Sequence, residues 1–351
     1  MTNTARMIDQ IRCQAEACRE LGSPLYAGLL HDVAEDVLAG GPAVDVLAGH
    51  ESDPGPSALA LRLLGSVHRL VLQRRAPALA LTYPSVGGTG DVGAAWTALR
   101  HVLVEHRDEL RQQLQQAPQT NEVGRAAALV GGLHHIVHGR PGPVRLVEIG
   151  ASAGLNLLAD RFRVIAGDGR SVGPSTSPVV LDDAWHGRPP PRAARPEVVE
   201  RFGCDTAPVD ARTTEGRLRL TSYVWPDQKA RLERLRGALA IAAEVPVVVE
   251  RSDAVGFLQR LDLVPGTTTV LWHSVMWQYL SPTEQAAATA RIAELGARAD
   301  DKAGFAHLSL EPRRPAAGGR HEFLVVLRSW PGREERVLGT AAPHGLPTTW
   351  E

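Results

Sequence analysis

The chain has 351 residues, of which 44% are hydrophobic, and its formal net charge is -1 at neutral pH. This hydrophobic content is sufficient for one large core or two modest ones, and the length favours two domains. The near-zero net charge excludes a long-range electrostatic attraction to nucleic acid or to an anionic membrane surface.

The cysteines and the first residues indicate where the protein works. Cys13, Cys18 and Cys204 lack metal-ligand spacing and indicate a reducing compartment. The N-terminus leads into an amphipathic segment that carries Asp9 and Arg12 instead of an apolar signal core. No run reaches the roughly 18 apolar residues of a membrane span. We therefore expect a cytoplasmic protein with a small-molecule substrate and no membrane or nucleic-acid partner, and leave a homo- or hetero-oligomer open.

Residues 1–140 have the pattern of a helical domain. Apolar side chains recur at helical spacing from Ile8 to Cys18, and a second such segment follows Ser23 and stops at Gly40. Proline- and glycine-rich stops separate the helices that we predict next, over 57–75, 92–116 and 120–138. The sequence predicts an all-helical N-terminal domain or cap.

From residue 141 short apolar runs alternate with helical patterns. The predicted strands are 144–149, 245–249, 268–273, 306–311 and 323–330. This alternation predicts an α/β domain over 141–351 with a mainly parallel sheet covered on both faces. A proline-rich insertion near 170–215 is expected at the surface, and Arg217–Tyr223 has the pattern of a short strand.

The most informative segment runs from Leu146 to Asn156, where a buried strand ends in a glycine-spaced turn. Gly150 and Gly154 would let the backbone approach a ligand closely. Ser152, Asn156 and the free amides of a following helix would offer hydrogen bonds. The third glycine of a dinucleotide fingerprint is missing, so the turn predicts a different nucleotide-like ligand.

Polar residues follow the other predicted strands at the same end. In an open parallel sheet, ligands bind outside the carboxyl ends of the strands. That rule makes Glu148, Asp253, Trp272, His273 and Glu311 candidate site residues.

Three sequence blocks carry a family resemblance. They are VEIGASAGLN at 147–156, VWPDQ at 224–228 with RLERL at 231–235, and LWHSVMWQYL at 271–280. Together they resemble a bacterial family of unknown function that is grouped with the class I S-adenosylmethionine-dependent methyltransferases. The resemblance implies a Rossmann-like methyltransferase sheet beneath the helical domain, with S-adenosylmethionine as cofactor.

The resemblance also implies roles for individual residues. Glu148 would be the acid of the first motif, and Asp253 would receive the exocyclic amine of adenine. Asp168 is a weaker candidate for the acid that binds ribose. The residues that would wrap the methionine and ribose portion are Gly150, Ser152 and Gly154.

Several side chains have a chemical and a structural interpretation. His273 would accept a proton during methyl transfer, or it would only fix a loop. Glu311 lies at the mouth of the site or in a solvated turn. Asp227 is a general base or the N-cap of the next helix. Trp272, Trp277 and Tyr279 would form an aromatic wall around a cationic sulfonium, with core packing as the alternative for Trp277. His134 and His138 have metal-type spacing, but we predict ordinary surface or interface histidines and no metal.

A serine-hydrolase hypothesis competes for the same turn, because 150–154 match Gly-x-Ser-x-Gly. Ser152 would be the nucleophile and Asp253 the acid, with His273, His307 or His321 as the base.

The leading interpretation is an S-adenosylmethionine-dependent methyltransferase that acts on a small or medium-sized metabolite. The alternatives are an enzyme of the same fold that catalyses a cofactor-independent elimination or cyclisation in a biosynthetic pathway, and a non-catalytic partner subunit.

Overall fold

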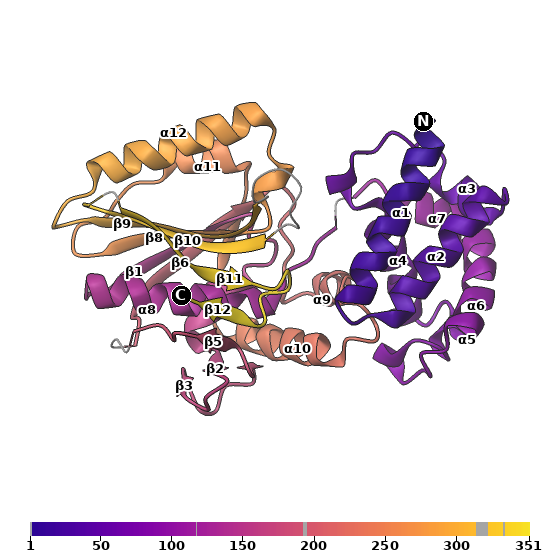
Figure 1. Cartoon of the computed structure of the whole chain (residues 1–351), viewed down its shortest axis with the longest axis horizontal. Helices are drawn as coiled ribbons and strands as arrows, with labels where there is room; N and C mark the ends of the chain where they lie inside the picture. The colour runs from indigo at the N-terminus through magenta and orange to yellow at the C-terminus, as the bar shows by residue number, and fades with distance from the viewer. Residues whose placement is uncertain (1, 117, 192–194, 314–321, 333) are drawn as a thin grey trace. The chain divides into compact units, whose positions relative to one another are not determined.

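The computed structural model describes the chain except residues 1, 117, 192–194, 314–321 and 333. The chain forms two compact units (Figure 1). The helical unit contains residues 1–120 and 213–232, and the sheet unit contains residues 121–212 and 233–351.

The helical unit has its own hydrophobic core. Trp225, from the segment 213–232, is part of this core. Its elements are α1 (Asn3–Glu20), α2 (Pro24–Leu38), α3 (Pro42–Leu47), η1 (Gly55–Ser57), α4 (Leu59–Leu72), α5 (Pro77–Ala80), η2 (Pro84–Val86), α6 (Val92–Glu105), α7 (Arg107–Gln113) and α9 (Thr214–Ser222).

Two expectations for this unit need correction. The helix predicted over 92–116 is divided at His106 into α6 and α7. The predicted strand Arg217–Tyr223 is helix α9, whose first turn is capped by the Thr213 hydroxyl, 2.9 Å from the amide nitrogen of Gly216. Alternating arginine and leucine imitates a strand pattern, but the cap favours a helix.

The sheet unit is a mixed α/β structure. Its strands are β1 (Val144–Ile149), β2 (Arg163–Ile165), β3 (Ser171–Val172), β4 (Val180–Leu181), β5 (Trp185–Gly187), β6 (Val198–Asp205), β7 (Val248–Arg251), β8 (Thr268–Ser274), β9 (Gly304–Arg313), β10 (Glu322–Trp330), β11 (Glu334–Ala341) and β12 (Thr348–Trp350). Its helices are η3 (Val123–Arg125), α8 (Ala126–Gly139), η4 (Leu155–Arg161), α11 (Ala254–Arg260), η5 (Trp277–Tyr279), α12 (Pro282–Arg298) and most of α10 (Lys229–Glu244), which starts in the helical unit.

Among the described residues, nine strands form one large sheet in the order β5-β12-β11-β10-β9-β8-β1-β6-β7. The strands from β7 to β9 are parallel to one another, and β10, β11 and β12 continue the sheet with antiparallel pairs. From β1 the chain first adds β6 and β7 on one side and then β8 and β9 on the other. The strand order therefore reverses between β1 and β8, where open α/β sheets place their ligands.

The parallel, two-sided character of the sheet was predictable, but part of its composition was not. The five predicted strands correspond to β1, β7, β8, β9 and β10. The proline-rich insertion was expected at the surface, yet it contains β6, which lies directly beside β1. Glu200 and Arg201 interrupt the apolar pattern of β6, so this strand gives a weak sequence signal. Strand β2, the next strand along the chain after β1, belongs to a separate sheet of β3, β2 and β4.

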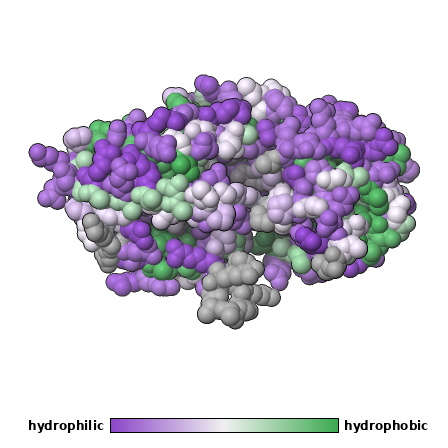
Figure 2. Space-filling model, turned by 90° about the horizontal axis from the view of Figure 1, so that it is seen from above, coloured by the Kyte–Doolittle hydropathy of each residue, from purple (hydrophilic) through white to green (hydrophobic). Residues whose placement is uncertain are grey.

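Helices cover both faces of the large sheet, with α11 and α12 on one face and α8 on the other (Figure 1). Leu271, Phe305 and Trp330 pack with Ile292 of α12 in the core of the first face. On the face visible in Figure 2 the surface is mostly hydrophilic, with smaller apolar areas. None of the described helices is long and apolar enough to cross a membrane.

Two glycines of α8 allow a matched test of the packing on the second face. A Cβ atom on Gly131 would lie 2.0 Å from Cζ2 of the buried Trp350 indole, whereas one on Gly139 would meet nothing within 4 Å. We expect Gly131→Ala to lower the free energy of unfolding by about 1–3 kcal/mol through overpacking. Gly139→Ala should cause no loss, because alanine stabilises a helix by roughly 0.5–1 kcal/mol relative to glycine. Urea denaturation measures both, and equal effects would contradict the Trp350 contact.

Candidate functional site

The turn after β1 is the centre of the candidate site. Gly150, Ser152 and Gly154 have φ angles of 69°, 53° and 72°, in the left-handed region that favours glycine. A Cβ atom on Gly150 would lie 2.9 Å from Cβ of Met276, so the segment after β8 lies directly against this turn. We call residues 150–155 the glycine loop. Its backbone conformation and its close neighbour both require the glycine at position 150.

The hydrogen bonds of the glycine loop differ from the sequence expectation. The element that follows it is the 3-10 helix η4, and the loop amides are not free. The backbone N–H groups of Ala153 and Leu155 donate to Oδ1 of Asn121 at 3.2 and 2.9 Å. Three further amides donate to protein acceptors as well, from Ala151 to the Cys204 carbonyl at 2.9 Å, from Ser152 to Oδ2 of Asp205 at 2.9 Å and from Gly154 to the Ala151 carbonyl at 2.7 Å. The expectation that free helix amides face a ligand is therefore wrong.

Glu148 lies beneath the loop in a group of buried polar side chains. It is 2% exposed, and Asn156 and Trp272 are its buried neighbours. Within the described residues, three atoms of this group have no hydrogen-bond partner: Oε2 of Glu148, Oδ1 of Asn156 and Nε1 of Trp272. Burial raises the pKa of Glu148 well above its ordinary value, and the nearby charge of Asp205 acts in the same direction. The fold therefore shifts Glu148 towards its neutral form, although Asn156 and Trp272 act in the opposite direction.

The raised pKa of Glu148 predicts how the stability of the fold changes with pH. When the pH exceeds the ordinary pKa of a glutamate, Glu148 ionises in the unfolded chain but stays neutral in the folded protein. The contribution of Glu148 to stability therefore falls as pH rises. Glu148→Gln is neutral in both states and removes this loss. We expect the stability gain of Glu148→Gln to grow between pH 4.5 and 7.5, by at most about 1.4 kcal/mol per pH unit. Urea denaturation at the two pH values measures it, and an equal gain at both would argue against a neutral Glu148.

Three other side chains form a connected group on the opposite face of the sheet. Trp272 is paired with Glu148, and His273 is the next residue along β8, so its side chain points to the other face. Nδ1 of His273 lies 2.7 Å from Oε1 of Glu311, and its Nε2 lies 2.9 Å from Nε2 of His307. The sequence-predicted pair His273 and Glu311 is therefore brought into contact, with His307 as a third member. We call these three residues the His–Glu–His chain.

The hydrogen-bond partners fix which nitrogens carry protons. Oε1 of Glu311 also accepts the backbone N–H groups of Met276 and Trp277 at 3.1 and 3.3 Å, so it is an acceptor and Nδ1 of His273 is the donor. Burial lowers the pKa of His307 well below its ordinary value, and the nearby His273, Arg328 and Arg313 also disfavour its charged form. His307 is therefore a neutral imidazole, and one hydrogen lies between the two Nε2 atoms.

Nitrogen NMR tests this arrangement without any ligand. At pH 8, in protein labelled with ¹⁵N-histidine, we expect His273 to be protonated at Nδ1 and unprotonated at Nε2, with His307 protonated at Nε2. Glu311→Leu removes the acceptor and should release His273 from the Nδ1–H tautomer. If His273 of the unmodified protein carries its proton on Nε2, the proposed chain of hydrogen bonds is wrong.

The segment after β8 connects the glycine loop to the His–Glu–His chain. Met276 lies against Gly150, and the Trp277 ring stacks on His273 with centroids 5.0 Å apart. Val275 has a φ of 51°, which is unusual for a β-branched residue. Of the predicted aromatic wall, Trp277 lies beside His273, Tyr279 is exposed and Trp272 is fully buried on the other face.

The predicted aspartates have other observed contacts. Asp253 follows β7 as expected, is exposed, and caps α11 through Oδ1, 2.7 Å from the Gly256 nitrogen. Asp168 is exposed and paired with Arg170 beside the small sheet, so it does not follow the strand next to β1. That position belongs to Asp205 at the end of β6.

Asp227 belongs to the helical unit. Its Oδ1 accepts the Ser23 hydroxyl at 2.6 Å, and its Oδ2 accepts the Leu25 amide at 3.0 Å. It therefore holds the start of α2, whereas we expected either a general base or a cap of the following helix.

The family model for uncharacterised proteins conserved in bacteria, DUF2332, matches residues 8–350. The chain belongs to this family. The comparisons with curated proteins and with solved structures return no match.

In this DUF2332 protein three site residues were missed by sequence reasoning. Asn121 gives no motif signal, because it acts through the chain's own amides. Asp205 could have been found only by recognising β6 as a strand. His307 is visible in the sequence as an alternating polar residue of β9, and was considered only as a hydrolase base.

The serine-hydrolase arrangement has little support in the described contacts. Ser152 is buried in the glycine loop, and the ring nitrogens of His273 are paired with Glu311 and His307. His321 lies outside the described residues. The carboxylate of Asp253 caps α11.

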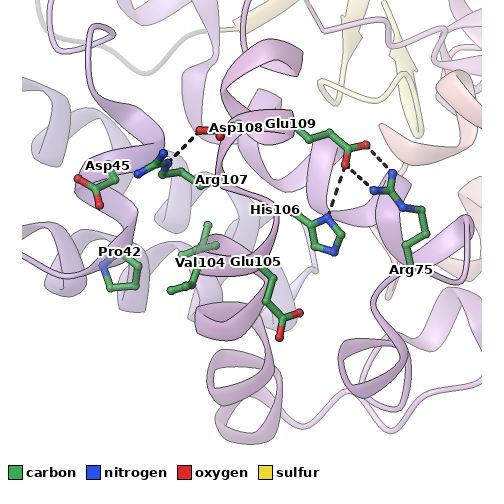
Figure 3. A pocket seen from close by; sticks show the side chains of 10 residues that line it. Pro42, Asp45, Arg75, Val104, Glu105, His106, Arg107, Asp108 and Glu109 are labelled. Carbon is green, nitrogen blue, oxygen red and sulfur yellow. Dashed lines mark hydrogen bonds and ion pairs between the residues drawn. The ribbon is translucent and has the colours of Figure 1, made fainter.

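One surface hollow of about 470 Å³ lies in the helical unit (Figure 3). Its charged side chains pair with each other, as Arg75 does with Glu109 at 2.6 Å and Arg107 with Asp108 at 3.0 Å. No predicted site residue lines it. Among the described residues, no group of three or more histidine, cysteine or acidic side chains is arranged to hold a metal ion.

Proposed function

We propose that this DUF2332 protein binds S-adenosylmethionine at the carboxyl edge of its sheet unit and methylates a small or medium-sized metabolite. The observation that carries the proposal is the glycine loop, which lies where the strand order reverses between β1 and β8. Beside it, the half-buried Asp205 ends the neighbouring strand.

The side chains at this edge of the sheet offer such a ligand more hydrogen-bond acceptors than donors. Ribose hydroxyls and an adenine amine are donors, and Asp205 and Asp253 follow two adjacent strands with carboxylate acceptors. The loop amides already donate to other acceptors, so the carboxylate of the methionine portion would need a cationic side chain instead. Arg125 supplies one, with Nη1 3.5 Å from the Ser274 carbonyl oxygen at the end of β8. Glu148 is assigned to the support of the loop because it is buried beneath it.

When bound, S-adenosylmethionine supplies an electrophilic methyl group on its sulfonium sulfur. The protein's own residues position the substrate and remove its proton. We propose that half-buried His307, and not His273, receives this proton at Nδ1. The Nε2 proton of His307 then passes to Nε2 of His273, and the resulting imidazolium is stabilised by Glu311 at 2.7 Å.

Isothermal calorimetry with S-adenosylmethionine and S-adenosylhomocysteine tests the proposal. We expect micromolar binding that weakens at least tenfold in Gly150→Ala, because the new Cβ is strained at positive φ and meets Met276. Gly169→Ala is the matched control, since Gly169 also has a positive φ of 83° but nothing within 4 Å. Asp253→Ser keeps a hydroxyl cap for α11 while it removes the carboxylate, and should also weaken binding.

Binding that is equal in Gly150→Ala and Gly169→Ala would place the ligand elsewhere, and absence of binding by the unmodified protein would overturn the cofactor assignment. A second candidate function would then remain, a cofactor-independent elimination or cyclisation. It is favoured by the bonded loop amides together with the His–Glu–His chain, which needs no cofactor to move a proton.

A further inference from the structure

The glycine loop is held from both sides by residues next to the connections between the two units. On one side Asn121 is the first residue of the sheet unit, directly after Thr120 of the helical unit. Its Oδ1 accepts the N–H groups of Ala153 and Leu155 at 3.2 and 2.9 Å. A single side-chain oxygen therefore joins this connection to two positions of the loop.

On the other side the residues before the second connection bond the middle of the loop. Asp205 Oδ2 accepts the Ser152 N–H at 2.9 Å, and the Val209 N–H donates to the Ser152 carbonyl at 3.1 Å. The chain passes into the helical unit at Thr213, four residues after Val209. Both backbone polar groups of Ser152 are thus used by the segment that leads to this connection.

The third connection between the two units is helical. It lies between residues 232 and 233, inside the continuous helix α10. The two connections that are not helical are therefore the two that bond the glycine loop. The two attachments bond adjacent residues of the loop, Ser152 on one side and Ala153 on the other, so a change at one attachment is transmitted to the other.

We propose that Asn121 and Asp205 are positioning residues that clamp the glycine loop between the two non-helical connections, so that the loop and both connections open and close together. By linkage, a ligand that orders the loop also orders the connections, and restraint of the connections strengthens ligand binding. The clamp itself needs no ligand, whereas its coupling to S-adenosylmethionine rests on the proposed function.

Hydrogen exchange measured at single amides tests the clamp in the ligand-free protein. Asn121→Leu removes the acceptor, and Asn121→Asp is the matched control that keeps an Oδ acceptor. In Asn121→Leu we expect the Ala153 and Leu155 amides to exchange at least tenfold faster, because both lose their partner. The decisive amide is Val209, on the opposite connection, which should also exchange severalfold faster. Asn121→Asp should resemble the unmodified protein at all three amides.

Faster exchange confined to Ala153 and Leu155 would mean that Asn121 is only a local cap, and would overturn the coupling. Unchanged exchange at both would overturn the clamp. Asp205→Ala supplies the reciprocal test, and should speed exchange of Leu155. The Ala184 amide, which donates to the Ile165 carbonyl in the insertion, is an internal reference that should not change.

S-adenosylhomocysteine then tests the ligand's part of the coupling. In the unmodified protein we expect it to slow exchange at the amides of residues 119–122, 205–207 and 209–212, and this effect should be lost in Asn121→Leu. If the unmodified protein does not bind this ligand, the proposed function fails while the ligand-free test of the clamp stands. If it binds without protecting either connection, the coupling to the ligand is wrong.

Discussion

The left-handed turn after β1 is the constraint on which the rest of the sheet unit depends. It takes the chain from the central strand into η4 within a few residues, and the close approach of Met276 leaves no room for a side chain at Gly150. A turn of this shape exposes several backbone amides, and buried amides without partners are costly. Asn121, Asp205 and the Cys204 carbonyl supply those partners, so segments distant in sequence are fixed around the turn.

The two faces of the sheet place acidic side chains in different surroundings. Glu148 is buried near the charge of Asp205, and its Oε2 has no partner among the described residues, which favours the neutral acid. Glu311 has three donors around Oε1, two of them backbone amides, while its Oε2 has no partner among the described residues. The alternation of side chains along β8 separates these environments although Trp272 and His273 are neighbours. One edge of a sheet thus combines a buried structural acid with a connected chain of proton-bearing groups.

Sequence patterns predicted the elements whose signal is local. Apolar spacing located most helices, five strands of the large sheet and the turn at Gly150, and the rule for parallel sheets brought His273 and Glu311 together. Elements stabilised by distant partners were mispredicted or missed. Strand β6 carries charged residues and is stabilised by pairing with β1, and α9 has a strand-like pattern but a good cap. Asp227 was judged by its sequence neighbours, whereas its partners, Ser23 and Leu25, are about 200 residues away.

The sequence by itself determined the family, the change from a helical half to an α/β half, and the identity of the turn, because repeating apolar spacing and glycine positions are properties of short segments. Only the tertiary structure decided which hydrogen-bonding groups are available. It assigned the loop amides to Asn121 and Asp205, joined His307 to His273, and separated Glu148 from both. Hydrogen bonds and pKa values depend on what surrounds a group in space, and that environment is set by residues far apart along the chain.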